Sequence, residues 1–182
     1  MKSTTKPLDI TLLRQSARQR MEEGALTAGY SADPTEVIAT LNSALATELV
    51  CVLRYRRHHF MASGIHSHAT AAEFLVHSNE EQGHADQLAE RIVQLGGEPD
   101  FSPDSLTKRS HAEYVEGVTL SDMIRENLVA ERIAIDSYRH AIESLGNDDP
   151  TTTRLLESIL AVEEEHADEL ADLLTQVPVK SS

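Results

Sequence analysis

The chain is poor in the residues that stabilise small disulfide-rich or aromatic-rich proteins. Its 182 residues include one cysteine, Cys51, no tryptophan and only 4% aromatic residues. A single cysteine excludes an internal disulfide and a cysteine-based metal cage, and it indicates a reducing compartment such as the cytoplasm. With few aromatic side chains, the core must be built from Leu, Ile, Val and Ala, which favours packed helices.

Continuous apolar runs and positive charge are also scarce. No uninterrupted apolar run approaches the length of a membrane span, so the sequence predicts no membrane partner. The sequence has 16 basic against 30 acidic residues, a net charge of −14. This charge argues against broad binding to DNA or anionic membranes and suits a protein that attracts cations.

The N-terminal arm, residues 1–33, is the exception to this charge pattern. Its first 23 residues have a slight excess of base. We expect the arm to be partly helical or flexible, with DNA contact as the less favoured role. The basic residues are Lys2, Lys6, Arg14, Arg18 and Arg20.

Residues 34–176 are expected to form one all-α domain, followed by a short tail at 177–182. Four long segments have helical periodicity, and they are bounded by capping residues or by Gly and Pro. One example is the Thr119–Asp122 capping box before the third segment. The expected helices span residues 34–62, 67–95, 119–146 and 149–176.

The lengths of the loops predict the topology. The loops SGIHS and GNDDP are short, so each flanking pair of helices should be antiparallel. Residues 96–118 can extend to ~75 Å, whereas a helix of this size is ~42 Å long. The sequence therefore predicts a four-helix bundle with one long crossover between the second and third helices.

A Glu-x-x-His motif occurs twice, in EQGHADQLA and in EEEHADELA. Each copy follows a lone glutamate by 33 or 32 residues, and each lone glutamate is followed seven residues later by tyrosine. The two helix pairs therefore look like a duplicated unit. The matching residues are Glu48, Tyr55, Glu81 and His84 in one half, and Glu131, Tyr138, Glu163 and His166 in the other.

The glutamates and histidines of this repeat share helix stripes with core residues such as Leu41 and Leu45, so they should be buried. Buried unpaired glutamate is rare, and we expect no buried Lys or Arg on those stripes to pair with them. Two divalent cations would neutralise four carboxylates, and the ligand types suit iron or manganese rather than structural zinc. The neighbouring Glu80, Glu164 and Glu165 are expected to face solvent. The predicted metal ligands and catalytic residues are Glu48, Glu81, His84, Glu131, Glu163 and His166.

Four segments resemble, in order, the helices of the ferritin-like superfamily, most closely bacterioferritin and Dps-like ferritins with a bacterioferritin-type di-iron site. The segments are LNSALATELVCVLRYRRH, EEQGHADQLAERIVQLGGEP, LVAERIAIDSYRHAI and ILAVEEEHADELADLL. The resemblance implies that Glu48 and Glu131 each bind one iron and that Glu81 and Glu163 bridge the two. Each histidine would complete one iron site, and Tyr55 would lie close by.

The same resemblance implies an iron-storage ferroxidase. Such a protein oxidises Fe(II) with O₂ or H₂O₂ at two iron ions per subunit, with manganese as an open alternative, and stores Fe(III) in a homo-oligomeric shell. Gln82 stands where bacterioferritin has its haem-ligating methionine, so no haem is expected. The sequence lacks the fifth helix of 24-subunit cages, which favours twelve subunits. A Dps-like DNA-protecting shell and a di-iron or di-manganese oxidase or catalase remain alternatives.

Other residues with metal-binding side chains have weaker predictions. His77, one helical turn before Glu81, is a candidate entry or third-metal ligand, although such histidines are more often merely polar. Cys51 is expected to be a small buried thiol. The histidines around the first interhelical turn are expected at the surface: His58, His59, His66 and His68.

Overall fold

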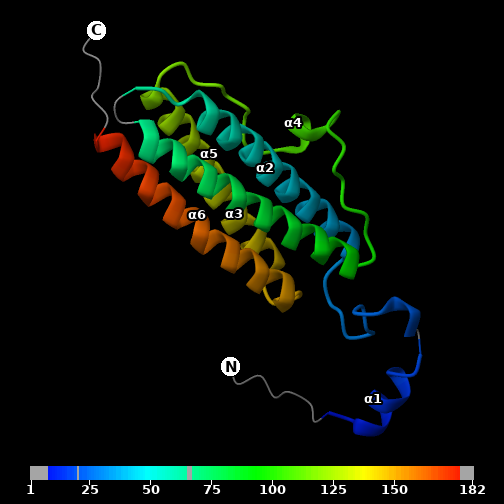
Figure 1. The fold of residues 1–182 in the computed structure, drawn as a ribbon. Helices are drawn as coiled ribbons and strands as arrows, with labels where there is room; N and C mark the ends of the chain where they lie inside the picture. Colours follow the sequence, from blue (N-terminus) through cyan, green and yellow to red (C-terminus); the bar gives the residue numbers. More distant parts are fainter. Residues whose placement is uncertain (1–7, 20, 65–66, 177–182) are drawn as a thin grey trace.

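The computed structural model describes residues 8–19, 21–64 and 67–176. Four long helices lie side by side as a bundle, and a short helix in the N-terminal arm lies outside it (Figure 1). The expected fold, an all-α bundle with one long crossover, is confirmed. The elements are α1 (Ile10–Ser16), the 3-10 turn η1 (Met21–Glu23), α2 (Pro34–Met61), α3 (Ser67–Gln94), α4 (Leu106–Arg109), α5 (Leu120–Leu145) and α6 (Pro150–Gln176).

Local capping chemistry explains where the helices begin and end. Asp33 directly precedes Pro34, the first residue of α2. Its side chain accepts a hydrogen bond from the Thr35 amide. At the start of α5, Thr119 and Asp122 form both hydrogen bonds of a capping box. Helix α5 is capped at its C-terminal end by Gly146, whose φ of 52° is a conformation that other residues rarely adopt.

The apolar core is divided along the bundle into two main clusters. The cluster nearest the start of α2 contains Leu41, Leu45, Leu88 and Ile159. The other contains Tyr55 with Phe74, Ile124 and Leu170. On each of the four long helices, the predicted metal ligands lie in the sequence between a residue of one cluster and a residue of the other. The bundle therefore places them at mid-height, between two apolar layers that exclude water.

Two buried arginines were not predicted, and both are bonded at other places in the core. Arg91 forms an ion pair with Asp149 at 3.0 Å. Arg54 donates to Asn127 Oδ1 at 2.9 Å and to the Glu113 carbonyl at 2.9 Å. Their charges thus have polar partners of their own.

Helix α2 is the one helix in the described parts of the chain that is long and apolar enough to cross a membrane by length and composition. This is weak evidence, because the core helix of a bundle passes the same test. Leu41, Leu45 and Tyr55 of α2 are fully buried in the core. Polar residues interrupt the apolar window, which is why the sequence has no continuous apolar run of that length.

Candidate metal centre

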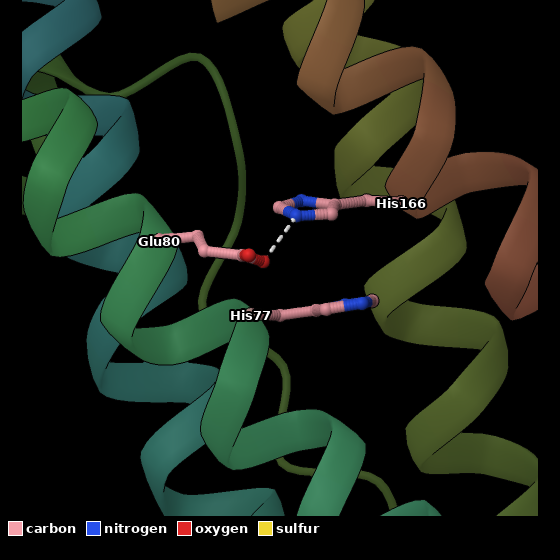
Figure 2. Close-up of side chains that lie close together, drawn as sticks. All are labelled: His77, Glu80 and His166. Atoms are coloured by element: carbon pink, nitrogen blue, oxygen red, sulfur yellow. Dashed lines mark hydrogen bonds and ion pairs between the residues drawn. The ribbon is translucent and has the colours of Figure 1, made fainter.

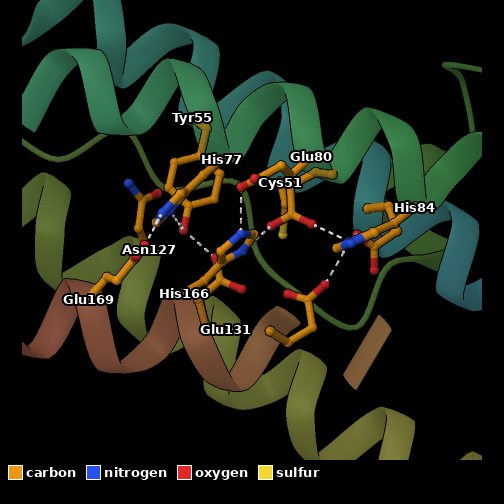
Figure 3. A network of polar contacts seen from close by, with 12 residues as sticks. Cys51, Tyr55, His77, Glu80, His84, Asn127, Glu131, His166 and Glu169 are labelled. Carbon is orange, nitrogen blue, oxygen red and sulfur yellow. Dashed lines mark hydrogen bonds and ion pairs between the residues drawn. The ribbon is translucent and has the colours of Figure 1, made fainter. Parts of the chain in front are cut away.

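The six predicted ligands come from all four long helices and meet inside the bundle. Figure 3 labels three of them, His84, Glu131 and His166. Each Glu-x-x-His pair lies on one face of its helix, because residues three apart are neighbours there. The most exposed of the six, His84, has only 5% of its surface accessible. We call them the carboxylate–histidine cluster: Glu48 on α2, Glu81 and His84 on α3, Glu131 on α5, and Glu163 and His166 on α6.

In one half of the cluster, three carboxylates surround His84. Its Nδ1 atom lies 2.9 Å from Glu163 Oε1, 3.0 Å from Glu81 Oε2 and 3.4 Å from Glu48 Oε2. Donor atoms of these four residues all lie within 4.8 Å of one another. Four buried donors at this separation can surround one metal ion.

The other half of the cluster has the same composition. Donor atoms of Glu81, Glu131, Glu163 and His166 also lie within 4.8 Å of one another. His166 Nδ1 and Glu81 Oε1 are 3.5 Å apart, and within the described residues neither atom has a hydrogen-bond partner. Buried polar atoms normally have partners. Glu81 and Glu163 belong to both groups of four, so they are the residues that could contact two ions at once.

Two buried tyrosines hold the carboxylates that are not shared. Tyr55 donates its hydroxyl hydrogen to Glu131 Oε1, and Tyr138 donates to Glu48 Oε1. Burial, together with these neighbouring carboxylates, raises the pKa of both phenols well above its usual value. Both tyrosines therefore stay neutral donors. Each tyrosine serves the glutamate of the other half of the repeat, so the two halves support each other.

The cluster carries protons where no metal is bound. Burial and neighbouring carboxylates raise the pKa of Glu81 and Glu163 well above the ordinary value. Burial alone would lower the pKa of His84, but Glu163 and Glu48 outweigh it and raise that pKa to about 10. Burial would raise the pKa of Glu48, but hydrogen bonding to His84 lowers it.

These pKa shifts predict that metal binding releases protons. A ligand must lose its proton before it can bind a metal. Because the pKa of His84 is about 10, each cluster should release at least one proton at pH 7, and affinity should rise up to about tenfold per pH unit per proton. Calorimetric titration with Mn²⁺ in two buffers of different ionisation enthalpy measures this release. Equal heats in both buffers would contradict the prediction.

Glu80 is more than the solvent-facing charge expected from the sequence. Its side chain is 47% exposed, yet its Oε2 atom lies 2.9 Å from His166 Nε2. A face of the His166 ring stacks on His77, with ring centroids 4.0 Å apart and an interplanar angle of 17° (Figure 2). Glu80 thereby orients His166 so that Nδ1 faces the cluster. The expectation of a solvated side chain holds for Glu165, which is exposed.

The expectation that the histidines near the first interhelical turn lie at the surface is wrong for His58. His58 is fully buried, with Nδ1 3.1 Å from Asn127 Oδ1 and Nε2 2.9 Å from the Glu116 carbonyl. These partners lie on α5 and on the crossover, so no local pattern around His58 predicts them. His66 lies outside the described residues. Cys51 is buried, as expected, and burial raises its thiol pKa well above the usual value.

A bundle with one long crossover and a buried carboxylate–histidine cluster defines a class of helical proteins built for divalent metals. Residues 38–179 match the ferritin-like domain. The chain belongs to the ferritin-like family.

Curated relatives and solved structures support this membership. The chain is 35% identical to a nutrient stress-induced DNA-binding protein from a Nostoc species, over 75% of this chain and 76% of the relative. It is 29% identical to bacterioferritin from Desulfovibrio desulfuricans, over 72% and 70%. A dodecameric thioferritin, the bacterioferritin-related protein of Bacteroides fragilis, aligns with a TM-score of 0.77 and 30% identity, over 80% of this chain and 88% of that one.

Proposed function

We propose that this protein is a ferroxidase that binds two Fe(II) ions per subunit at the carboxylate–histidine cluster. It oxidises them with O₂ or H₂O₂ and stores the Fe(III) inside a homo-oligomeric shell in the cytoplasm. One observation carries the proposal: two groups of four buried donors share Glu81 and Glu163. The D. desulfuricans bacterioferritin, whose structure describes a di-iron site, aligns with a TM-score of 0.69 and 26% identity, over 78% of this chain and 80% of that one.

Charge balance supports a pair of divalent cations as the substrate. Four ionised carboxylates carry a charge of −4, which two Fe(II) ions neutralise. Burying either the four anions or the two cations alone in the interior of the bundle would cost much free energy. In the proposed arrangement, Glu48 and His84 bind one Fe(II), Glu131 and His166 bind the other, and Glu81 and Glu163 bind both. The shared carboxylates hold the two ions close enough to give up one electron each to the same oxidant.

The reaction needs no other electron source. Two Fe(II) ions each lose one electron to H₂O₂, whose O–O bond breaks, and two protons complete the formation of two water molecules. With O₂ as the oxidant, the same two electrons and two protons give H₂O₂. The Tyr138 hydroxyl holds the Glu48 carboxylate and the Tyr55 hydroxyl holds the Glu131 carboxylate throughout. Glu80 holds the His166 ring.

Carboxylates with one imidazole per ion suit manganese as well as iron, and the di-iron relatives favour iron here. No haem is expected at Gln82, whose amide donates to Asp86 Oδ1 at 2.9 Å. We propose a shell of twelve subunits, because the B. fragilis protein is described as dodecameric. The mass of the assembled particle and its iron content, measured on the same sample, test shell size and storage together.

The test of the catalytic proposal is the oxidation of Fe(II) by the purified protein. Anaerobic protein loaded with two Fe(II) per subunit should oxidise them on mixing with H₂O₂ much faster than buffer alone, as followed by ferric absorbance. A rate equal to that of buffer would overturn the proposal. Oxygen release from H₂O₂ by manganese-loaded protein, without iron oxidation, would assign the cluster to a catalase instead.

A second candidate function is DNA protection, which the name of the Nostoc relative favours. Among the basic residues of the arm, Arg14 and Arg18 are exposed, whereas Lys2, Lys6 and Arg20 lie outside the described residues. The net charge of −14 opposes this function. A gel shift that weakens steeply with salt and disappears on deletion of residues 1–23 would support DNA binding. An unshifted band at low salt would exclude it.

A further inference from the structure

We propose that Glu73, His77 and Glu169 form a third divalent-cation site, at which Fe(II) binds before it moves into the carboxylate–histidine cluster. The inference rests on the proposed function, because it assigns a delivery step to the same reaction. We call these three residues the access site. They lie on α3 and α6. Figure 3 shows His77 and Glu169 at the side of the cluster that contains Glu131 and His166.

The separation of the donor atoms fits a metal ion. His77 Nε2 lies 2.9 Å from Glu169 Oε2 and 3.6 Å from Glu73 Oε1. The three donor atoms all lie within 4.8 Å of one another. Nitrogen and oxygen ligands bind transition metals at about 2.1 Å, so ligands at 90–120° to one another are about 3.0–3.6 Å apart. One ion can therefore contact all three side chains without a large rearrangement.

The hydrogen bonds of His77 leave a place for a cation. Tyr55 gives its only hydroxyl hydrogen to Glu131, so its oxygen can only accept from His77 Nδ1, 3.2 Å away. The bond to Tyr55 uses Nδ1 and leaves Nε2 on the side of the two glutamates, 2.9 Å from Glu169 Oε2. One ring nitrogen and two carboxylate oxygens therefore converge on one point, and nitrogen and oxygen donors of this kind suit a divalent transition-metal ion.

The access site connects solvent to the buried cluster. The side chains of Glu73 and Glu169 are 38% and 44% exposed, whereas His77 is fully buried. The His77 ring stacks on His166 at 4.0 Å, and its Nδ1 atom reaches Glu131 through the Tyr55 hydroxyl. A cation bound at Nε2 is therefore one imidazole ring away from a ligand of the proposed centre. The two exposed carboxylates attract cations to this point.

The test counts bound cations and does not depend on turnover. Equilibrium dialysis of the intact assembled protein against Zn²⁺ should give three ions per subunit. The double variant Glu73→Gln/Glu169→Gln, altered only at half-exposed positions, should bind two with unchanged affinity. Its initial rate of Fe(II) oxidation at low Fe(II) should fall by about tenfold, while two Fe(II) per subunit are still oxidised. His77→Gln should give the same pattern.

Glu165→Gln is the matched control, because Glu165 is an exposed glutamate on α6 one turn before Glu169. It should bind three Zn²⁺ ions and oxidise iron at the normal rate. Three ions in the double variant, or two in the unaltered protein, would overturn the access site and leave the ferroxidase proposal standing. Loss of all ions in the double variant would show a structural role and overturn delivery. An unaltered protein that binds no pair of ions would instead overturn the proposed function.

Discussion

Glu163→Ala is expected to lower the rate of Fe(II) oxidation about 100-fold or more. Removal of a residue that only supports a ligand costs 10–100-fold in metal affinity or activity, and loss of a ligand shared by two ions should cost at least as much. Glu163 donor atoms belong to both groups of four. Alanine would leave each ion with three protein ligands and would remove one of the two carboxylates that both ions share. Glu81→Ala should have the same effect for the same reason.

The comparison between shared and unshared ligands makes this prediction specific. Glu48→Ala removes a ligand from one ion only, so the protein should still bind one metal per subunit tightly. Glu163→Ala should weaken both sites together. Stopped-flow oxidation and metal titration of the two variants measure the difference, with Glu165→Ala as the exposed control on the same helix. If Glu48→Ala and Glu163→Ala lose the same number of ions with the same affinity, Glu163 does not bridge.

The fold was predictable because its determinants are local. Asp33 before Pro34, the Thr119–Asp122 box and Gly146 mark helix ends within a few residues of sequence. Loop lengths then decide which helices are antiparallel. The short helix α4 inside the crossover was not predicted, because Leu106, its buried residue, is stabilised by packing on α2 residues such as Ala46 and Val50. That packing partner is distant in sequence.

The sequence predicted those residues of the candidate site that belong to the repeated motifs. The two Glu-x-x-His copies and the two lone glutamates identify residues that the bundle brings together. Glu80 and His77 carry no such repeated signal, because their partners, His166 and Glu169, lie on another helix. The sequence also does not indicate that each tyrosine donates to the glutamate of the other half of the repeat. Spacing of seven places Tyr55 on the stripe of Glu48, while its hydroxyl reaches Glu131.

Glu163→Gln is expected to stabilise the metal-free protein by about 2 kcal/mol, although it disables the proposed centre. Glutamine keeps the shape of the side chain and removes one of four buried carboxylates. His84 keeps Glu81 and Glu48 as partners. In a domain of this size, the change should raise the midpoint of thermal unfolding by about 4–8 °C.

The pH dependence of that difference has a definite sign. Burial and the carboxylates of Glu81, Glu48 and Glu131 raise the folded-state pKa of Glu163 well above the ordinary value of 4.5. A carboxyl group with a raised pKa costs nothing below its unfolded pKa, and destabilises the folded state increasingly as pH rises toward its folded pKa. The variant and the unaltered protein should therefore unfold at similar temperatures near pH 4.5. The gap should widen at pH 8.

Metal should reverse the order of stability. A cation that binds only the folded state adds about 4 kcal/mol when its concentration is 1,000 times the dissociation constant, and the unaltered cluster offers two such sites. Glu163→Gln replaces a shared anionic ligand with a weak neutral one, so it should gain far less. The measurement is thermal unfolding at pH 8, with chelator and with excess Mn²⁺. The variant should have the higher unfolding midpoint with chelator, and the unaltered protein should have the higher midpoint with Mn²⁺. If the variant is the more stable protein in both conditions, the cluster does not bind metal tightly. The cost of burying its carboxylates would then not be offset by a bound cation.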